Sequence, residues 1–272
     1  MNKFSSTPVE MFFSLWKHRT LLLRLIKRDI IGRYKGSIMG IFWSFFNPLL
    51  MLAIYTFVFG EVFNARWSGG VDSKVEFALI LFSGLIVFNL FSECISQAPG
   101  QIIANKNYVK KVIFPIETLS WVTMGSAIFH FIISMTVWII AYILLYGVPH
   151  FTILFTPIIL LLLMGIIMGF SWFLAAFGVY LRDIGQVVTL LITATMFLSP
   201  IFFPLSAMPQ VYQPFLMMNP LTIPIEQLRA IAFYGELPNW NLLFNYSLVS
   251  TFIAWLGFVC FQKTRKGFAD VL

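Results

Sequence analysis

Residues 118–181 read TLSWVTMGSAIFHFIISMTVWIIAYILLYGVPHFTILFTPIILLLLMGIIMGFSWFLAAFGVYL and contain no Asp, Glu, Lys or Arg. A helix needs about 20 predominantly apolar residues to cross a bilayer, so this stretch has room for two crossings. The sequence GVPH at residues 147–150 has the composition of a turn and divides the stretch. The stretch therefore predicts two membrane-spanning helices, at residues 118–146 and 151–181.

The composition of the whole chain is that of a membrane protein. Of its 272 residues 59% are hydrophobic and 11% are charged, against roughly 25% charged residues in soluble domains. The first 20 residues lack a compact apolar core followed by a small-residue cleavage site, so no signal peptide is expected. Cys94 and Cys260 lie in apolar stretches and are interpreted as small buried side chains, not as a disulfide or a metal site.

Further apolar runs complete the predicted fold class, which is an all-α integral membrane protein with a single transmembrane domain, residues 1–272. The first run follows Lys35, and the last ends near Gln262. We expect six transmembrane helices, at residues 36–60, 77–104, 118–146, 151–181, 184–200 and 240–262.

The cations are distributed unevenly between the two faces of this predicted topology. Because even-numbered spans return the chain to its starting side, all but three of the 18 Lys and Arg lie on the face that carries both termini. The exceptions are Arg66, Lys74 and Arg229. The positive-inside rule therefore predicts that both termini are cytoplasmic, and the net charge of +7 is not interpreted as a nucleic-acid-binding surface.

Residues 200–238 lie between the last two predicted spans and contain seven prolines. The segment is apolar enough for lipid, and residues 184–200 before it would rise only about 25 Å as a helix, against a hydrocarbon core of about 30 Å. We expect short re-entrant or interfacial helices on the outer side, buried in protein or lining a cavity. The alternative is an ordinary outer loop that lies on the lipid headgroups.

The segment KRDIIGRYKGSIMGIFWSF, residues 27–45, passes from a cation-rich sequence to an apolar and aromatic one. Its first residues, 27–33, are also the last residues of a predicted cytoplasmic amphipathic helix region, residues 9–33. This region is expected to lie in the membrane plane. Glycines at positions 32, 36 and 40 recur every fourth residue and favour close helix packing over a bend. The helix would place Arg24, Lys27 and Arg28 on one face and Leu22, Leu23, Leu25, Ile26 and Ile30 on the other.

This helix has two interpretations. It is either an anchor that only fixes the topology, or a surface for docking and substrate access. In the second case a lipid-linked phosphate would meet cations and a hydroxyl at the headgroup level, namely Arg28, Arg33, Tyr34 and Lys35.

The sequence lacks the motifs of a metal- or ATP-dependent enzyme. It has no G-x-x-x-x-G-K-[ST] phosphate loop and no H-E-x-x-H, so neither a bound cofactor nor a metal site is predicted. Glu93 is the one acid within the predicted spans, and the sequence leaves open whether it bonds Gln97 or faces water. This scarcity of charge disfavours a gradient-driven carrier, and the dispersed acids disfavour a glycosyl or acyl transferase.

Four segments in order resemble the signatures of one family, the ABC-2-type permeases that export polysaccharides. Within that family the chain is most similar to the O-antigen exporters of Gram-negative bacteria, with capsule and teichoic-acid exporters as near neighbours. The segments are KRDIIGRYKGSIMGIFWSFFNPLLMLAIYTFVF (27–59), NKNYVKKVIFPIE (105–117), YLRDIGQVVTLLITATMFLSPIFFP (180–204) and NPLTIPIEQLRA (219–230).

The resemblance implies an inner-membrane permease without ATPase activity of its own. It implies a homodimer docked on two copies of a separate ATP-binding subunit, which would hold ATP and magnesium. The cargo would be a lipid-linked polysaccharide. In the family the N-terminal helix and the first cytoplasmic loop contact the ATPase, and the matching positions are Arg24, Lys27, Arg28, Asn105, Lys106, Tyr108, Lys110 and Lys111.

Aromatic residues near the first and fifth predicted spans are candidates for a sugar-conducting pore. Sugar C–H faces stack on rings, and sliding past rings requires no fixed hydrogen-bond pattern. The alternative is that these rings face lipid or form interfacial belts, since the chain has 31 Phe. The candidates are Trp43, Phe46, Tyr55, Phe59, Phe197 and Phe202.

Overall fold

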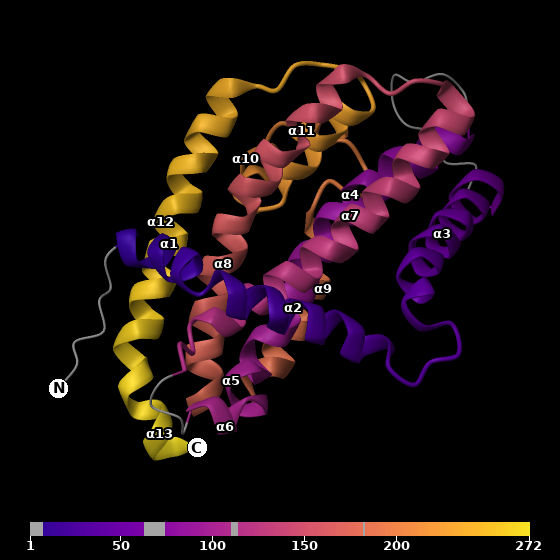
Figure 1. The fold of residues 1–272 in the computed structure, drawn as a ribbon. Helices are drawn as coiled ribbons and strands as arrows, with labels where there is room; N and C mark the ends of the chain where they lie inside the picture. The colour runs from indigo at the N-terminus through magenta and orange to yellow at the C-terminus, as the bar shows by residue number, and fades with distance from the viewer. Residues whose placement is uncertain (1–7, 63–73, 110–113, 182) are drawn as a thin grey trace.

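The computed structural model describes residues 8–62, 74–109, 114–181 and 183–272 of the chain. Within these ranges all regular secondary structure is helical, as predicted (Figure 1). The α-helices are α1 (Pro8–Lys17), α2 (Arg19–Tyr34), α3 (Trp43–Tyr55), α4 (Lys74–Gln97), α5 (Gln101–Ala104), α6 (Lys106–Val109), α7 (Thr118–Tyr146), α8 (Thr156–Tyr180), α9 (Ile184–Leu198), α10 (Gln213–Met217), α11 (Thr222–Ala232), α12 (Trp240–Thr264) and α13 (Phe268–Val271).

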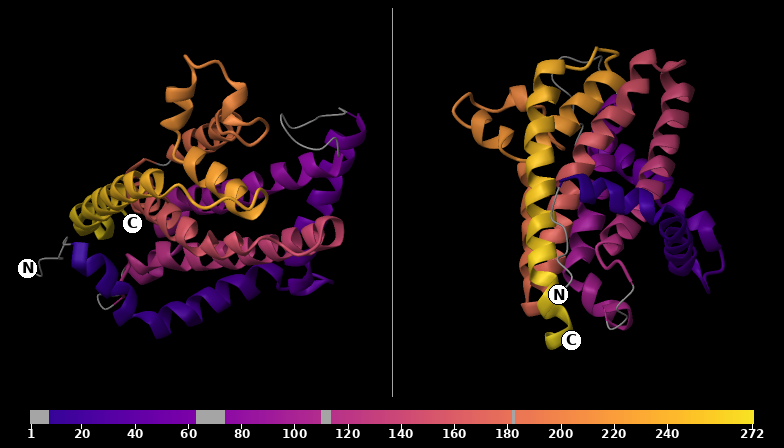
Figure 2. Two further views of the ribbon diagram at one scale, coloured as in Figure 1. Left: turned by 90° about the horizontal axis from the view of Figure 1, so that it is seen from above. Right: turned by 60° about the vertical axis from the view of Figure 1, so that its left-hand side comes forward.

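The long helices α4, α7, α8 and α12 form a bundle, and α3 stands to one side of it (Figures 1 and 2). α4 is the central helix, because its side chains from Phe77 to Phe82 are almost fully buried. One end of the bundle carries α5, α6 and α13, and we call it the basic end. The opposite end carries α11 and the turn at residues 147–150, and we call it the proline-rich end (Figure 1).

Glycines let α8 and α12 approach closely. A Cβ atom on Gly257 of α12 would lie 2.0 Å from the carbonyl oxygen of Gly169 on α8. A Cβ atom on Gly169 would in turn lie 2.4 Å from the carbonyl oxygen of Ile253. Glycine at both positions therefore permits backbone-to-backbone contact, which is the usual basis of helix association where lipid removes the hydrophobic driving force.

Among the described residues, five helices are long and apolar enough to cross a membrane. The second, third, fourth and last predicted spans agree with them within a few residues at each end. α9 has 15 residues and rises only about 22 Å, so the fifth predicted span, the total of six and the sidedness of the termini stay predictions. The five helices are Gly40–Phe59, Glu76–Ala104, Thr118–Tyr146, Phe151–Tyr180 and Trp240–Gly267.

The first span begins later than predicted, because the chain turns sharply before it. Gly36 and Gly40 adopt φ angles of 87° and 54°, which only glycine adopts readily. A Cβ atom on Gly32, Gly36 or Gly40 would meet nothing within 4 Å. The expectation that these glycines serve helix packing was therefore wrong, and two of them serve the bend instead.

The predicted amphipathic region, residues 9–33, is two helices, α1 and α2, which meet at His18. α2 crosses the first half of α7 obliquely (Figure 1). The crossing is close because Ile26 lies over Gly125, where a Cβ atom would approach the Cδ1 atom of Ile26 to 2.3 Å. α2 is thus packed on the bundle.

The apolar side chains of α2 are divided between the protein interior and the outside of the bundle. Leu22, Leu25 and Ile30 are buried, but Leu23 is 67% exposed. The predicted apolar face was expected to lie in acyl chains, and Leu23 remains available for that, whereas Leu22, Leu25 and Ile30 are used in packing within the chain.

The proline-rich segment, residues 200–238, contains the predicted short helices, α10 and α11. α11 packs against α4 and α8, and most of its residues are buried. The depth of these helices in a bilayer stays a prediction.

Arg229 anchors α11 to its neighbours. The residue is charged, yet only 1% of its surface is exposed. Its Nε donates to the carbonyl oxygen of Ile80 at 3.2 Å, and its Nη2 donates to that of Ile201 at 2.7 Å. Its Nη1 donates to the carbonyl oxygen of Pro200 and pairs with Glu226 at 3.2 Å. Pro200 and Ile201 come just after the end of α9, where carbonyl groups lack hydrogen-bond donors from the helix itself. Arg229 supplies those donors.

Replacing Arg229 by Leu removes one donor from each of three carbonyl groups in a buried site. The carbonyl group of Ile80 keeps the Ser83 hydroxyl as a donor, whereas those of Pro200 and Ile201 lose the guanidinium group. We expect the free energy of unfolding to fall by about 3 kcal/mol or more, measured by thermal unfolding in detergent. The control is Glu226→Gln, because the Glu226 side chain is 33% exposed and its loss is expected to cost less than about 1 kcal/mol. Equal losses in the two variants would contradict the anchoring role.

Candidate functional site

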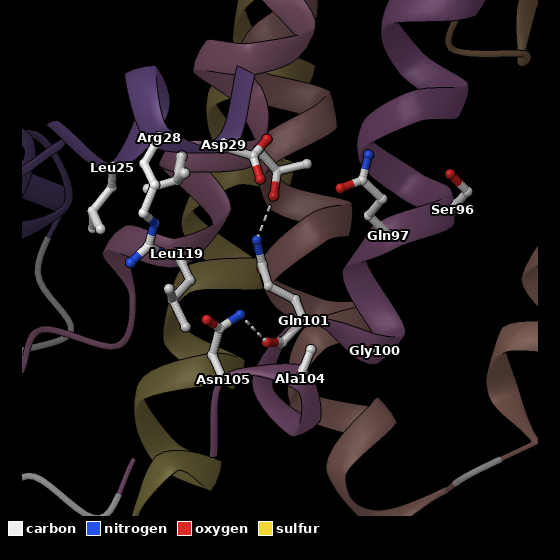
Figure 3. Close-up of a pocket in the computed structure, with 12 residues that line it drawn as sticks. Leu25, Arg28, Asp29, Ser96, Gln97, Gly100, Gln101, Ala104, Asn105 and Leu119 are labelled. Carbon is white, nitrogen blue, oxygen red and sulfur yellow. Dashed lines mark hydrogen bonds between the residues drawn. The ribbon is translucent and has the colours of Figure 1, made fainter. Parts of the chain in front are cut away.

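A polar cavity of about 430 Å³ lies at the basic end, between α2, the end of α4, α5 and the start of α7 (Figure 3). Hydrogen-bonding side chains from all four helices line it, which suits a polar occupant. These side chains are Arg28, Asp29, Ser96, Gln97, Gln101, Asn105 and Thr123.

Gln101 holds one wall of the cavity in place. Its Nε2 donates to Thr123 Oγ1 at 2.6 Å, and its Oε1 accepts from Ser120 Oγ at 2.9 Å. Asn105 Nδ2 donates to the carbonyl oxygen of Gln101 at 2.9 Å (Figure 3). These bonds join α5 to α7, so this wall has a defined shape.

Arg28 and Tyr108 connect α2 with α6. Arg28 Nη1 donates to the Tyr108 hydroxyl oxygen at 2.8 Å, and the guanidinium carbon lies 5.9 Å from the centre of the tyrosine ring. That ring stacks on Phe114 at a centroid distance of 4.4 Å. Two residues predicted for coupling, 80 positions apart in the chain, are therefore in direct contact.

The other predicted coupling residues lie around this contact. Arg24 and Lys27 are exposed on α2, Lys106 is exposed on α6, and Asn105 is half-buried beside it. Residues 110 and 111, also predicted, lie outside the described residues. The exposed cations form a basic surface, and its role in coupling stays a prediction.

Glu117 and Arg265 fix the end of the segment 105–117, just before α7 begins. Arg265 Nη1 donates to Glu117 Oε2 at 2.6 Å, and its Nη2 donates to the carbonyl oxygen of Phe114 at 3.2 Å. Trp172 Nε1 donates to the carbonyl oxygen of Glu117 at 3.1 Å. Nothing in the sequence pairs Glu117 with Arg265, since 148 positions separate them.

A polar network joins the end of α2 to α4 and α7. Arg33 donates to Glu93 Oε1 through Nη1 and pairs with Asp29 through Nη2 at 3.2 Å. His130 Nδ1 lies 3.0 Å from Glu93 Oε2, and the Tyr34 hydroxyl lies 3.0 Å from His130 Nε2. Glu93 is therefore shared between a cation of α2 and a histidine of α7.

This network answers the question that the sequence leaves open about Glu93. Gln97 bonds Arg33, at 3.4 Å, and Glu93 bonds Arg33 and His130. A carboxylate inside an apolar helix is a signal that a cation lies nearby. The sequence does not say which cation, because Arg33 is 60 positions away.

The surroundings of Arg33 keep it cationic. Burial, the largest effect, lowers the pKa of Arg33, but its attraction to Glu93 and Asp29 raises it, and the net pKa lies above the usual value. Burial also raises the pKa of Tyr34, so its hydroxyl stays protonated at neutral pH.

The residues predicted to meet a lipid-linked phosphate differ in their present partners. Arg28 bonds Tyr108, and Arg33 bonds two carboxylates, so a phosphate would compete with these groups. Lys35 is exposed and forms no ion pair with a described residue. The phosphate-binding role stays a prediction for the whole set.

Four of the six candidate pore aromatics form a continuous series of ring contacts. Tyr55 lies 6.4 Å from Phe59, Phe59 lies 6.2 Å from Phe202, and Phe202 lies 6.0 Å from Phe197, all between ring centroids. The structure thus brings the rings of the first span next to Phe202, which follows α9, and Phe202 in turn next to Phe197 near the end of α9.

The remaining two candidates, Trp43 and Phe46, form a separate pair with a centroid distance of 5.6 Å. They lie at the start of α3, within one turn of each other. The sequence placed all six rings in one group, and the structure divides them into two.

Comparison with known proteins decides the family. Residues 20–233, which run from α2 to just past α11, match the model of the ABC-2 type transporter family. The chain belongs to the ABC-2 type transporter family. It is a multi-pass membrane protein, and the matched region includes the cavity, the Arg28–Tyr108 contact and the polar network.

Relatives of this ABC-2 type transporter extend over nearly the full chain. It is 25% identical over 264 residues to an O-antigen export system permease protein of Myxococcus xanthus, covering 96% of this chain and 99% of that protein. It is 26% identical over 266 residues to one of Klebsiella pneumoniae, covering 97% and 99%. It is also 26% identical over 254 residues to a polysialic acid transport protein of Escherichia coli, covering 89% and 92%.

We expect the Arg33–Glu93 pair of this transporter chain to show a coupling energy of about 1 kcal/mol in a double-mutant cycle with Arg33→Gln and Glu93→Gln. The pair joins two helices and is largely shielded from water, with side chains 29% and 18% exposed. Thermal unfolding in detergent provides the measurement.

The Arg33–Asp29 pair is the matched control, because it lies within α2 and Asp29 is 38% exposed. Its coupling is expected below about 0.5 kcal/mol. A coupling for Arg33 and Glu93 that is indistinguishable from zero would show that the network does not hold the helices together.

Proposed function

We propose that this chain is the permease subunit of an ATP-driven exporter that moves a lipid-linked polysaccharide across the inner membrane. O-antigen is the favoured polymer, since two of the three relatives described above are O-antigen export permeases. Capsular polysaccharide, suggested by the polysialic acid relative, and teichoic acid are the alternatives.

The contact between Arg28 and Tyr108 carries the proposal. It joins the N-terminal helices to the loop of residues 105–117, the two segments that the family resemblance assigns to the ATPase. The chain has no phosphate loop of its own, so the energy has to come from a separate subunit. We infer two copies of an ATP-binding subunit, each holding ATP and magnesium and docked at the basic end, which is then cytoplasmic.

A homodimer of six-span subunits fits the exposure of α3. Only 11% of the span Gly40–Phe59 is buried within the chain, so α3 has room for a second copy on its outer face. α9 would be the fifth of the six spans along the chain, short because it continues into the proline-rich segment. Both termini would then be cytoplasmic, in accord with the positive-inside rule.

The substrate path in this proposal follows the aromatic contacts between Tyr55 and Phe197. Rings from the first span, from the end of α9 and from the segment after it would offer successive stacking surfaces to the sugar chain. The lipid phosphate would first meet Lys35, and its transfer to Arg33 would require the carboxylates of Glu93 and Asp29 to give way.

The partner decides between this exporter and a gradient-driven carrier. The chain is purified by affinity from its native membrane in mild detergent, and co-purifying proteins are identified by mass spectrometry. We expect a stoichiometric protein with a phosphate-loop ATPase motif. In the Arg28→Gln variant its yield is expected to fall about tenfold, because a charge-assisted contact at the docking surface is lost.

Lys263→Gln is the matched control, an exposed cation at the same end of the bundle that takes no part in the contact. Its yield of partner is expected to equal that of the unmodified chain. A preparation that moves substrate without any ATPase would replace the exporter by a carrier.

Tyr55→Ala is expected to reduce export several-fold while the assembly with the ATPase stays intact. It interrupts the ring series at the α3 side, which removes one of the proposed stacking surfaces for the sugar chain. Export of labelled polysaccharide and gel-filtration elution are measured together. Phe252→Ala on α12, whose ring is 57% exposed, is the control, and unchanged export on alanine substitution at all six candidates would exclude the aromatic path.

A further inference from the structure

An apolar groove lies on the surface of the bundle, between α1 and α2 on one side and α7 and α8 on the other. It has a volume of about 270 Å³. Leu22 and Ile26 of α2 form one side, and Met124 and Ile128 of α7 form the other. Among the described residues that line it, Arg19 alone is charged, and it stands at the start of α2.

A second apolar groove continues the first under α1. Its volume is about 160 Å³, and it shares Trp121 and Met164 with the first groove. Met11 covers it from α1, and residues of α8 and α12 form its floor. Together the two grooves follow the underside of the bend at His18, where α1 ends and α2 begins.

The surroundings of the grooves place them at a membrane surface. Phe13, Trp16 and Leu23 are 55%, 65% and 67% exposed on α1 and α2, and exposed apolar side chains gathered on neighbouring helices mark a surface for lipid or for another protein. Residues 11–28 contain five Lys and Arg and no acid. Exposed apolar side chains interleaved with cations are characteristic of helices at the boundary of acyl chains and headgroups.

Arg19 is positioned to receive an anion at the mouth of the groove. Its guanidinium carbon lies 5.1 Å from the centre of the Trp16 ring, and Nη1 donates to the Trp16 carbonyl oxygen at 3.2 Å. These contacts orient the guanidinium group and use one of its five N–H donors. The remaining donors suit the oxygens of a phosphate.

We propose that the groove binds one membrane phospholipid with an anionic headgroup. One acyl chain fills the apolar space between α2 and α7, and the phosphate bonds Arg19. The bound lipid then adds to the packing of the α1–α2 bend on the bundle, because it fills the apolar space that the side chains of α2 and α7 leave between them. This site is separate from the polar cavity at Gln101, and it takes a lipid of the bilayer and not the exported cargo.

The test is native mass spectrometry of the full chain with its associated subunits, purified in mild detergent and equilibrated with equal amounts of phosphatidylglycerol and phosphatidylcholine of the same acyl chains. We expect one retained phosphatidylglycerol per chain. In Arg19→Gln the preference for phosphatidylglycerol is expected to fall about five-fold, the effect of one cation near an anionic surface. In Ile128→Trp the indole occupies the groove and the retained lipid is lost.

Each variant has a nearby control, at the end of α1 for Arg19 and on α7 for Ile128. Lys17→Gln removes a neighbouring cation that does not line the groove, and Ile132→Trp adds an indole one turn along α7, at a position 55% exposed. Both are expected to retain the lipid as the unmodified chain does. If Ile128→Trp fails to fold, as judged by gel filtration, the Arg19→Gln and Lys17→Gln pair decides the matter.

Three results would overturn the proposal. The first is equal retention of both lipids by the unmodified chain, which indicates annular lipid only. The second is an unchanged retained lipid in a folded Ile128→Trp variant. The third is the same loss of preference in Lys17→Gln as in Arg19→Gln, which indicates diffuse charge and no site.

Discussion

Polar groups that leave water have to find partners within the protein, and the helices of this bundle are held together where those partners occur. Trp138 of α7 donates to the carbonyl oxygen of Leu79 on α4 at 2.9 Å. Arg229 of α11 satisfies the carbonyl groups that follow α9. In each case a side chain from one helix bonds the backbone of another segment. The irregular backbone of the proline-rich end is therefore supported by the same bonds that position its helices.

The basic end shows the same constraint with charged groups. Arg28 joins α2 to α6, Arg33 joins α2 to the central helix α4, and Arg265 joins α12 to the start of α7. α2 is thus in contact with both a short, exposed helix and the centre of the bundle. In the proposed exporter, a movement of α6 caused by a soluble ATPase would reach α4 through two contacts. This path is made of direct hydrogen bonds, so its two ends are physically connected.

Span boundaries were largely predictable, whereas the glycine-rich bend was not. The predicted bounds at residues 118–146 match α7, because the ends of a long uncharged run depend on composition alone. Gly36 and Gly40 were assigned to packing, yet they form the turn before α3. Glycine serves both purposes for the same reason, the absence of a Cβ atom, and only the tertiary structure shows whether another helix lies close to it.

The sequence by itself determined that this chain is a helical membrane protein with a basic end, since transfer into lipid is governed by the length and polarity of each segment taken alone. The resemblance of its segments to a family added the expectation that α2 and residues 105–117 act together. Only the tertiary structure decided which polar groups meet. Glu93 pairs with Arg33 and His130, and Glu117 pairs with Arg265, across 37 to 148 positions of sequence. These pairings depend on how the helices cross, because hydrogen bonds require a separation of about 3 Å that no local pattern specifies.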